Sequence, residues 1–212
     1  MNSSPLHSIV HEAPIVAIVR RPSVDPVRCV RNLFEAGIRL VEVTMDTPGA
    51  AQILGSLRLE VPSNALLGAG TVTDIARAQA ALAAGASFIV TPNLSLDVIR
   101  FAHDHGLPII PGAMTPTEIF NAAAAGADYV KVFPASALGP SYFRELRGPF
   151  AEIPLIATGG VTLENAREFI RFGVDALGIG SSLLPRSNAG FSRCAEIAQE
   201  FLQIALEARA AR

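Results

Sequence analysis

The chain has 212 residues, of which 50% are hydrophobic and 17% are charged, and its formal net charge is −2. This charge gives no general attraction for nucleic acid or for anionic membranes, so neither is expected as a partner. No run of roughly 18 apolar residues predicts a membrane span, and no basic leader precedes an apolar stretch at the start. We therefore expect one cytoplasmic domain over residues 1–212.

Eight apolar segments predict β-strands, with helical patterns between them. In chain order they are IVAIV from Ile15, RLVEVTM, ALLGAG from Ala65, SFIVTP, LPIIPG, DYVKVFP, PLIATGG from Pro154 and DALGIGSS. The strands are apolar on both faces, which is typical of a parallel sheet covered by helices. Eight units favour a (β/α)8 TIM barrel, and an open doubly wound sheet is the alternative.

Local signals support the helices between these strands. Glycines at positions 37, 85, 106, 126 and 173 suit the left-handed residue that follows a helix. In TPTEIF, Thr115 and Glu118 form a capping-box pattern, and Pro116 suits the first turn. Cys29 and Cys194 have no metal-ligand spacing, so we expect them to be ordinary reduced thiols.

The barrel hypothesis places chemistry at the carboxyl ends of the strands. Because alternate strand residues point inward, Glu42 and Lys131 should face the barrel interior, together with Thr44 and Phe133. Four further residues lie at or near strand ends with inward parity: Arg20, Thr71, Pro92 and Thr158.

Lys131 is the only lysine in the chain. Inside a barrel it would lose hydration, which lowers the pKa of its ammonium group and favours a neutral amine that can form a Schiff base with a ketone. A lysine that reaches the barrel mouth, or merely pairs with Glu42, is the alternative.

Glu42 is the only acid within a predicted strand core. A partly desolvated carboxyl group has a raised pKa and can shuttle protons during Schiff-base formation. The alternative is a structural partner for Arg20 or Lys131, and both interpretations place Glu42 in the site.

Two glycine-rich loops follow the last two predicted strands and indicate a phosphate site. Gly159 and Gly160 allow close backbone approach, and Gly180, Ser181 and Ser182 offer N–H groups and hydroxyls. No metal site is expected, because the triplet His103, Asp104, His105 falls in the last turn of a helix at the end away from the active face.

The motifs EVTMDTP, GAGTV, FIVTPN, PGAMTPTE, KVFPAS, GPF, TGGV and GIGSSL together resemble the 2-keto-3-deoxy-6-phosphogluconate (KDPG) aldolase family. That family includes phosphogalactonate (KDPGal) and 4-hydroxy-2-oxoglutarate aldolases. The resemblance runs from about Pro14 to Leu184 and implies a metal-independent class I aldolase, usually a homotrimer, with no cofactor. Such an enzyme cleaves a phosphorylated keto acid to pyruvate and glyceraldehyde 3-phosphate, as in the Entner–Doudoroff route.

Carried over by position, the resemblance assigns Lys131 as the Schiff-base lysine and Glu42 as the general acid and base. It also implies a substrate pocket, with Thr71, Pro92, Phe133 and Thr158 around the pyruvyl portion and Gly160, Gly180, Ser181 and Ser182 at the phosphate end.

One position departs from the family pattern, since Asp46 stands where many members have an arginine that holds the substrate carboxylate. Arg20 is the expected replacement. The departure leaves the preferred sugar acid open. A phosphate-binding barrel that works without a lysine adduct, as an epimerase, decarboxylase or synthase, and a non-catalytic phosphosugar binder are the alternative functions.

Overall fold

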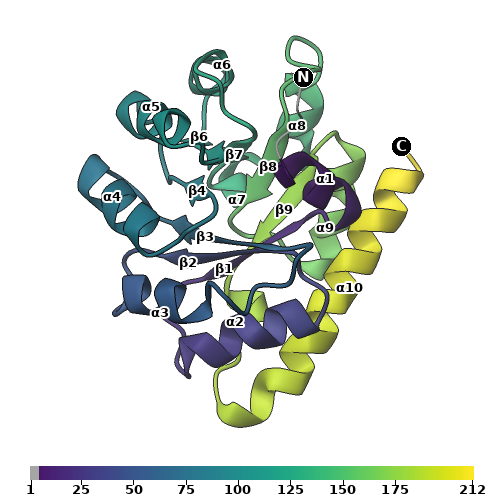
Figure 1. Ribbon diagram of the computed structural model, residues 1–212. Coiled ribbons are helices and arrows are strands. Elements are labelled where there is room, and N and C mark those ends of the chain that lie inside the picture. Colours follow the sequence, from purple (N-terminus) through teal and green to yellow (C-terminus); the bar gives the residue numbers. More distant parts are fainter. Residues whose placement is uncertain (1–4) are drawn as a thin grey trace.

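A barrel of parallel strands surrounded by helices is the architecture of the computed structural model, which describes residues 5–212 (Figure 1). Residues 1–4, on which the expectation about a leader partly rests, lie outside the described residues. The strands are β1 (Ile15–Val19), β2 (Leu40–Thr44), β3 (Leu66–Gly70), β4 (Ile89–Val90), β5 (Ile109–Ile110), β6 (Gly112–Ala113), β7 (Val130–Val132), β8 (Leu155–Thr158) and β9 (Ala176–Ile179).

The sheet closes on itself at Pro111. Its strand order is β5-β4-β3-β2-β1-β9-β8-β7-β6 and every pair is parallel. The two outer strands, β5 and β6, are the halves of one predicted strand, LPIIPG, because Pro111 has no N–H to donate to a ladder. The Pro111 carbonyl still accepts a 2.9 Å hydrogen bond from the Lys131 backbone N–H. The (β/α)8 prediction is confirmed, and the open-sheet alternative is wrong.

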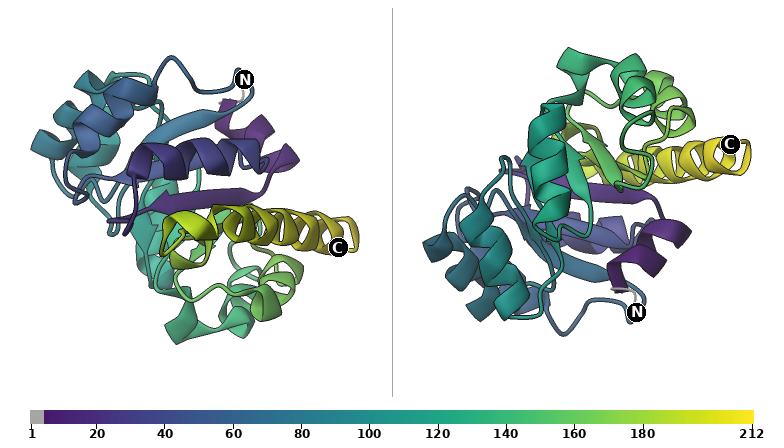
Figure 2. Two further views of the ribbon diagram at one scale, coloured as in Figure 1. Left: turned by 90° about the horizontal axis from the view of Figure 1, so that it is seen from below. Right: turned by 90° about the horizontal axis from the view of Figure 1, so that it is seen from above.

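The helices lie around the barrel and also at one end of it. They are α1 (Pro5–Glu12), α2 (Pro26–Glu35), α3 (Ala50–Leu57), α4 (Ile75–Ala83), α5 (Leu96–Asp104), α6 (Pro116–Ala124), α7 (Ala135–Leu138), α8 (Pro140–Leu146), α9 (Leu163–Arg171) and α10 (Phe191–Ala210), with 3₁₀ turns η1 (Ser181–Leu183) and η2 (Asn188–Gly190). The long α10 packs beside α2 and α9 (Figure 2). Within the described part of the chain, none of these helices combines the length and the apolar character needed to cross a membrane.

Local sequence signals position the helix ends as expected. The glycines at 37, 85, 106, 126 and 173 all have positive φ, between 66° and 103°. The predicted capping box is present at α6, where Thr115 and Glu118 satisfy each other's backbone N–H groups.

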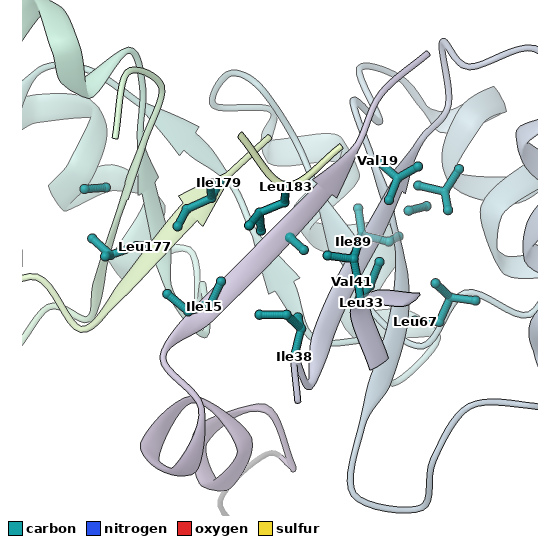
Figure 3. Close-up of a cluster of buried hydrophobic side chains, with 14 of the residues drawn as sticks. Ile15, Val19, Leu33, Ile38, Val41, Leu67, Ile89, Leu177, Ile179 and Leu183 are labelled. Carbon is teal, nitrogen blue, oxygen red and sulfur yellow. The ribbon is translucent and has the colours of Figure 1, made fainter. Parts of the chain in front are cut away.

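Two apolar layers lie on the two faces of the sheet. Outward-facing side chains such as Val41, Leu67 and Leu177 pack between the strands and the helices (Figure 3). The inner layer is a separate cluster filled by the following side chains: Val16, Leu40, Leu66, Phe88, Val90, Ile110, Tyr129, Ile156 and Ala176.

Helix α1 closes the amino-terminal end of the barrel, and the sequence patterns did not predict it. Its Leu6, Ile9 and Val10 join the inner cluster, which includes Leu40 and Ala176, the first residues of β2 and β9. The opposite, carboxyl end therefore remains open for a site.

Candidate active site

A hollow of about 420 Å³ opens at the carboxyl ends of the strands. Nine predicted site residues line it: Arg20, Lys131, Phe133, Thr158, Gly159, Gly160, Gly180, Ser181 and Ser182. We call it the main hollow. Residues from β1, β7, β8 and β9 and the loops after them are brought together there, as the barrel prediction requires.

Glu42 and Lys131 meet just below the main hollow. They line a small cavity with Thr158, surrounded by apolar side chains of the inner face. Val130 and Val132, the neighbours of Lys131 in β7, belong to the outer apolar layer. The predicted strand parity is therefore confirmed in β7.

The Lys131 side chain is 4% exposed. Burial lowers the pKa of its ammonium group, and the positive charge of Arg20 lowers it further, against the opposing effect of Glu42. Its Nζ lies 5.5 Å from the centroid of the Phe133 ring. The site therefore favours a neutral amine next to open space.

The Glu42 carboxyl group is fully buried, and neither of its oxygens has a hydrogen-bond partner among the described residues. Burial raises its pKa, opposed by the positive charges of Lys131 and Arg20. Gly70 provides the room, because a Cβ at that position would lie 2.6 Å from Glu42 Oε1. A carboxyl group of this kind exchanges protons at higher pH than an exposed one.

The loop after β8 takes a conformation that requires glycine. Gly159 and Gly160 have φ of +91° and +72°, and a Cβ on Gly160 would overlap the Ser136 side chain. Asn165 fixes the loop to the start of α9, since it accepts from the Thr162 N–H at 2.8 Å and donates to the Gly160 carbonyl at 2.9 Å. At Gly159 and Gly160 the loop thus borders the main hollow with backbone alone.

The loop after β9 lies beside it and presents hydroxyls. Ser181 is exposed and Ser182 is half-buried, and both line the main hollow at the start of η1. The two loops form an uncharged cradle of the kind that binds phosphate through N–H and O–H groups.

Thr71 and Pro92 do not line the main hollow. Thr71 reaches the site through Arg20, whose Nη2 donates a 2.9 Å hydrogen bond to Thr71 Oγ1. Thr71 also has a φ of +56°, which is unusual for a β-branched residue. The backbone of Pro92 lies against Gly112 in β6, at the place that a Cβ on Gly112 would occupy.

Asp46 faces two arginines rather than the barrel interior. Its Oδ1 lies 3.8 Å from Arg20 Nε, and its Oδ2 lies 3.2 Å from Arg21 Nε. The Arg21 Nε also donates a 2.9 Å hydrogen bond to the Asp46 carbonyl. The negative charge of Asp46 is therefore balanced by these two arginines, and Arg20 is held at the edge of the main hollow.

The histidine triplet lies at the end of α5 and has contacts of its own. His103 Nε2 is 3.0 Å from the Gly126 carbonyl oxygen, and His105 Nδ1 is 2.8 Å from that of Phe101. Between residues 5 and 212, no group of three or more His, Cys, Asp or Glu side chains is arranged to hold a metal ion.

Sequence reasoning missed several residues at the site. Ile18, Val161, Thr162 and Leu184 also line the main hollow. Arg21 was missed too, although its position directly after Arg20 at the end of a strand is the signal that could have found it.

Comparisons with known proteins show which family this chain belongs to. The family model of KDPG and KHG aldolases matches residues 6–199. A 2-dehydro-3-deoxy-6-phosphogalactonate aldolase of Escherichia coli strain K12 is 36% identical, over 92% of this chain and 96% of its own. A 2-dehydro-3-deoxy-phosphogluconate aldolase of Treponema pallidum strain Nichols is 39% identical, over 92% of this chain and 93% of its own. A solved structure described as native KDPGal superimposes with a TM-score of 0.85 at 36% identity, covering 92% of this chain and 95% of its own.

The fold and the site define a class, an α/β-barrel enzyme with a buried lysine and carboxyl group at the carboxyl end of its strands. Within that class the assignment is specific. The chain belongs to the KDPG and KHG aldolase family, and it is an aldolase.

Proposed function

We propose that this protein is a class I aldolase that cleaves a 2-keto-3-deoxy-6-phospho sugar acid to pyruvate and glyceraldehyde 3-phosphate. The names of its relatives support the substrate class. The observation that carries the proposal is the buried Lys131, with its lowered pKa, next to the unpartnered carboxyl group of Glu42.

The reaction starts with the neutral amine of Lys131, which attacks the C2 ketone of the substrate. Glu42 donates a proton to the carbinolamine hydroxyl, and loss of water gives a protonated Schiff base. Glu42, now a carboxylate, accepts the C4 hydroxyl proton as the C3–C4 bond breaks. The bonding electrons move through C3 to the iminium nitrogen, which leaves an enamine and releases glyceraldehyde 3-phosphate. Glu42 then gives this proton to C3 of the enamine, and hydrolysis of the Schiff base releases pyruvate and returns Lys131.

The ends of the substrate are held by different groups. Arg20 can grip the substrate carboxylate with two hydrogen bonds. The N–H and O–H groups of the Gly159–Gly160 and Gly180–Ser182 loops take the phosphate. Phe133 and Thr158 line the main hollow between these ends, beside Lys131.

Trapping of the covalent intermediate tests the proposal. Incubation with pyruvate and borohydride should add the mass of a reduced pyruvyl group at Lys131. Lys131→Arg should abolish cleavage while the circular dichroism spectrum stays that of the wild type, because arginine has no accessible neutral amine. A barrel enzyme without a lysine adduct, or a non-catalytic binder, would show no mass gain.

The sugar acid is identified by comparing substrates. The two relatives described above act, by their names, on phosphogalactonate and phosphogluconate derivatives. Pyruvate release from each of these two substrates and from 4-hydroxy-2-oxoglutarate, measured with the same enzyme, determines the preferred configuration at C4. Release from none of them would contradict the proposed function.

We further propose that the protein works as a homotrimer in the cytoplasm. Large apolar side chains on one side of the barrel support an oligomer: Leu96, Met114 and Phe120 are 51%, 40% and 55% exposed. The buried free thiols of Cys29 and Cys194 suit a reducing compartment. Light scattering gives the mass in solution, and Phe120→Glu should lower it if this side forms the interface.

A further inference from the structure

A second hollow, of about 340 Å³, adjoins the main one. Three arginines line it, Arg20, Arg21 and Arg186, so we call it the arginine recess; its other lining residues are Pro22, Ser23, Ser181, Ser182, Leu184 and Pro185. Arg20, Ser181, Ser182 and Leu184 also line the main hollow. The recess and the main hollow therefore meet at the loop after β9.

The cradle for the phosphate has no charge of its own. Its two loops contribute glycines and serines, which offer N–H and O–H donors but no cation. A phosphate monoester carries a charge of about −1.5 to −2 near neutral pH. A cation in reach of the Ser181–Ser182 loop would balance this charge, and no acidic side chain lines the recess that borders the loop.

Two of the three arginines already have partners. Arg20 and Arg21 share the carboxylate of Asp46, and Arg20 also donates to Thr71. The Arg21 backbone N–H donates a 3.0 Å hydrogen bond to Thr47 Oγ1. These contacts fix both arginines but compensate part of their charge.

Arg186 differs from the other two. It is exposed, and among residues 5–212 no acidic group lies within ion-pairing distance of its guanidinium. The residue before it, Pro185, is buried and packs near Gly190, which places Arg186 beside the Ser181–Ser182 loop.

We propose that Arg186 binds the substrate phosphate at the Ser181–Ser182 loop and determines the preference for phosphorylated over unphosphorylated keto acids. The inference rests on the proposed function and refines its substrate end. A guanidinium offers the bidentate geometry that phosphate oxygens accept, and its charge complements the neutral donors of the loops.

Arg186→Gln tests this role with two substrates, the preferred 6-phospho sugar acid and its unphosphorylated counterpart. We expect KM for the phosphorylated substrate to rise about five- to tenfold with kcat within about twofold, since one charge-assisted contact far from the reacting carbons is lost. KM for the unphosphorylated substrate should not change. Arg186→Lys should recover part of the loss, because it restores the charge without the fork.

Arg100→Gln is the matched control. It removes the same charge from an exposed arginine on α5, whose only ion pair among the described residues is with Asp97. This variant should keep both KM values. An unchanged KM of Arg186→Gln for the phosphorylated substrate would overturn the inference.

A second measurement does not depend on turnover. Inorganic phosphate should raise the melting temperature of the wild type and of Arg100→Gln by the same amount, and that of Arg186→Gln by less. Equal shifts in all three proteins would overturn the inference. If neither sugar acid is cleaved but the shifts differ as expected, the proposed function fails while the anion site at Arg186 stands.

Discussion

Burial affects Lys131 and Glu42 in opposite directions, yet it favours the neutral form of both. The pKa of the amine is lowered and that of the carboxyl group is raised, in each case mainly because the charged form is desolvated. A neutral amine is the nucleophile that a Schiff base needs, and a protonated carboxyl group is the acid that removes water from the carbinolamine. Desolvation by burial therefore puts both Lys131 and Glu42 in the protonation state that Schiff-base formation needs.

Glu42→Gln separates this chemistry from a purely structural role. The amide keeps the shape of the side chain but cannot transfer a proton, so we expect kcat to fall by about 10²- to 10⁴-fold. Borohydride trapping of pyruvate at Lys131 should slow as well. A variant that keeps the wild-type kcat would show that Glu42 only balances the charges around it.

The lowered pKa of Lys131 also predicts how stability depends on pH. At pH values between the folded-state pKa of Lys131 and the ordinary lysine pKa, the unfolded chain binds more protons than the folded protein. The free energy of unfolding therefore rises with pH over this range. The buried lysine thus destabilises the fold most at lower pH and least near the ordinary lysine pKa. Lys131→Met, made in a Glu42→Gln background so that the carboxyl group does not titrate, should therefore be more stable than Glu42→Gln alone near neutral pH. Urea unfolding at several pH values should show this difference shrinking toward the ordinary lysine pKa; a constant difference would contradict it.

At the scale of elements, small residues in the strands make room for the reacting groups. Gly70 ends β3 and faces the Glu42 carboxyl group from the neighbouring strand. We expect Gly70→Ala to displace that carboxyl group and to lower kcat by about tenfold or more, since misplacement by about 1 Å can cost 10²-fold.

Gly55→Ala is the control for this substitution. Gly55 lies in α3, and the nearest atom to an added Cβ is the Ala84 carbonyl oxygen at 3.9 Å. Alanine should there stabilise the helix by about 0.5–1 kcal/mol and leave kcat unchanged. Equal kcat values for Gly70→Ala and Gly55→Ala would show that the reaction tolerates a displacement of the Glu42 carboxyl group.

The elements were predictable where the signal is local. Strand parity placed Lys131 and Glu42 on the inner face, and the capping box marked the start of α6. Helix α1 was not predicted because its eight residues bury only one apolar face, against a barrel end that does not exist until distant strands meet. The ties between Asp46 and its two arginines were missed for the same reason, since they join the end of β1 to the loop after β2.

Across the whole molecule, the two ends of the barrel have separate tasks. The carboxyl end holds the main hollow, and the amino end is filled by α1 and the inner apolar cluster. Pro111 joins the two outermost strands of the sheet, of which β5 pairs with β4 and β6 pairs with β7. Stability and chemistry should then respond to different substitutions.

Leu6→Ala tests this separation. Leu6 is fully buried in the inner cluster, and its truncation should lower the free energy of unfolding by about 2–4 kcal/mol, as other large-to-small core changes do. Leu59→Ala is the control, because Leu59 is 88% exposed and its truncation should change stability by less than about 0.5 kcal/mol. Both variants should keep the wild-type kcat at temperatures where they are folded, since α1 lies at the end of the barrel opposite Lys131. A fall in kcat for folded Leu6→Ala would mean that the packing of α1 reaches through the inner cluster to the site.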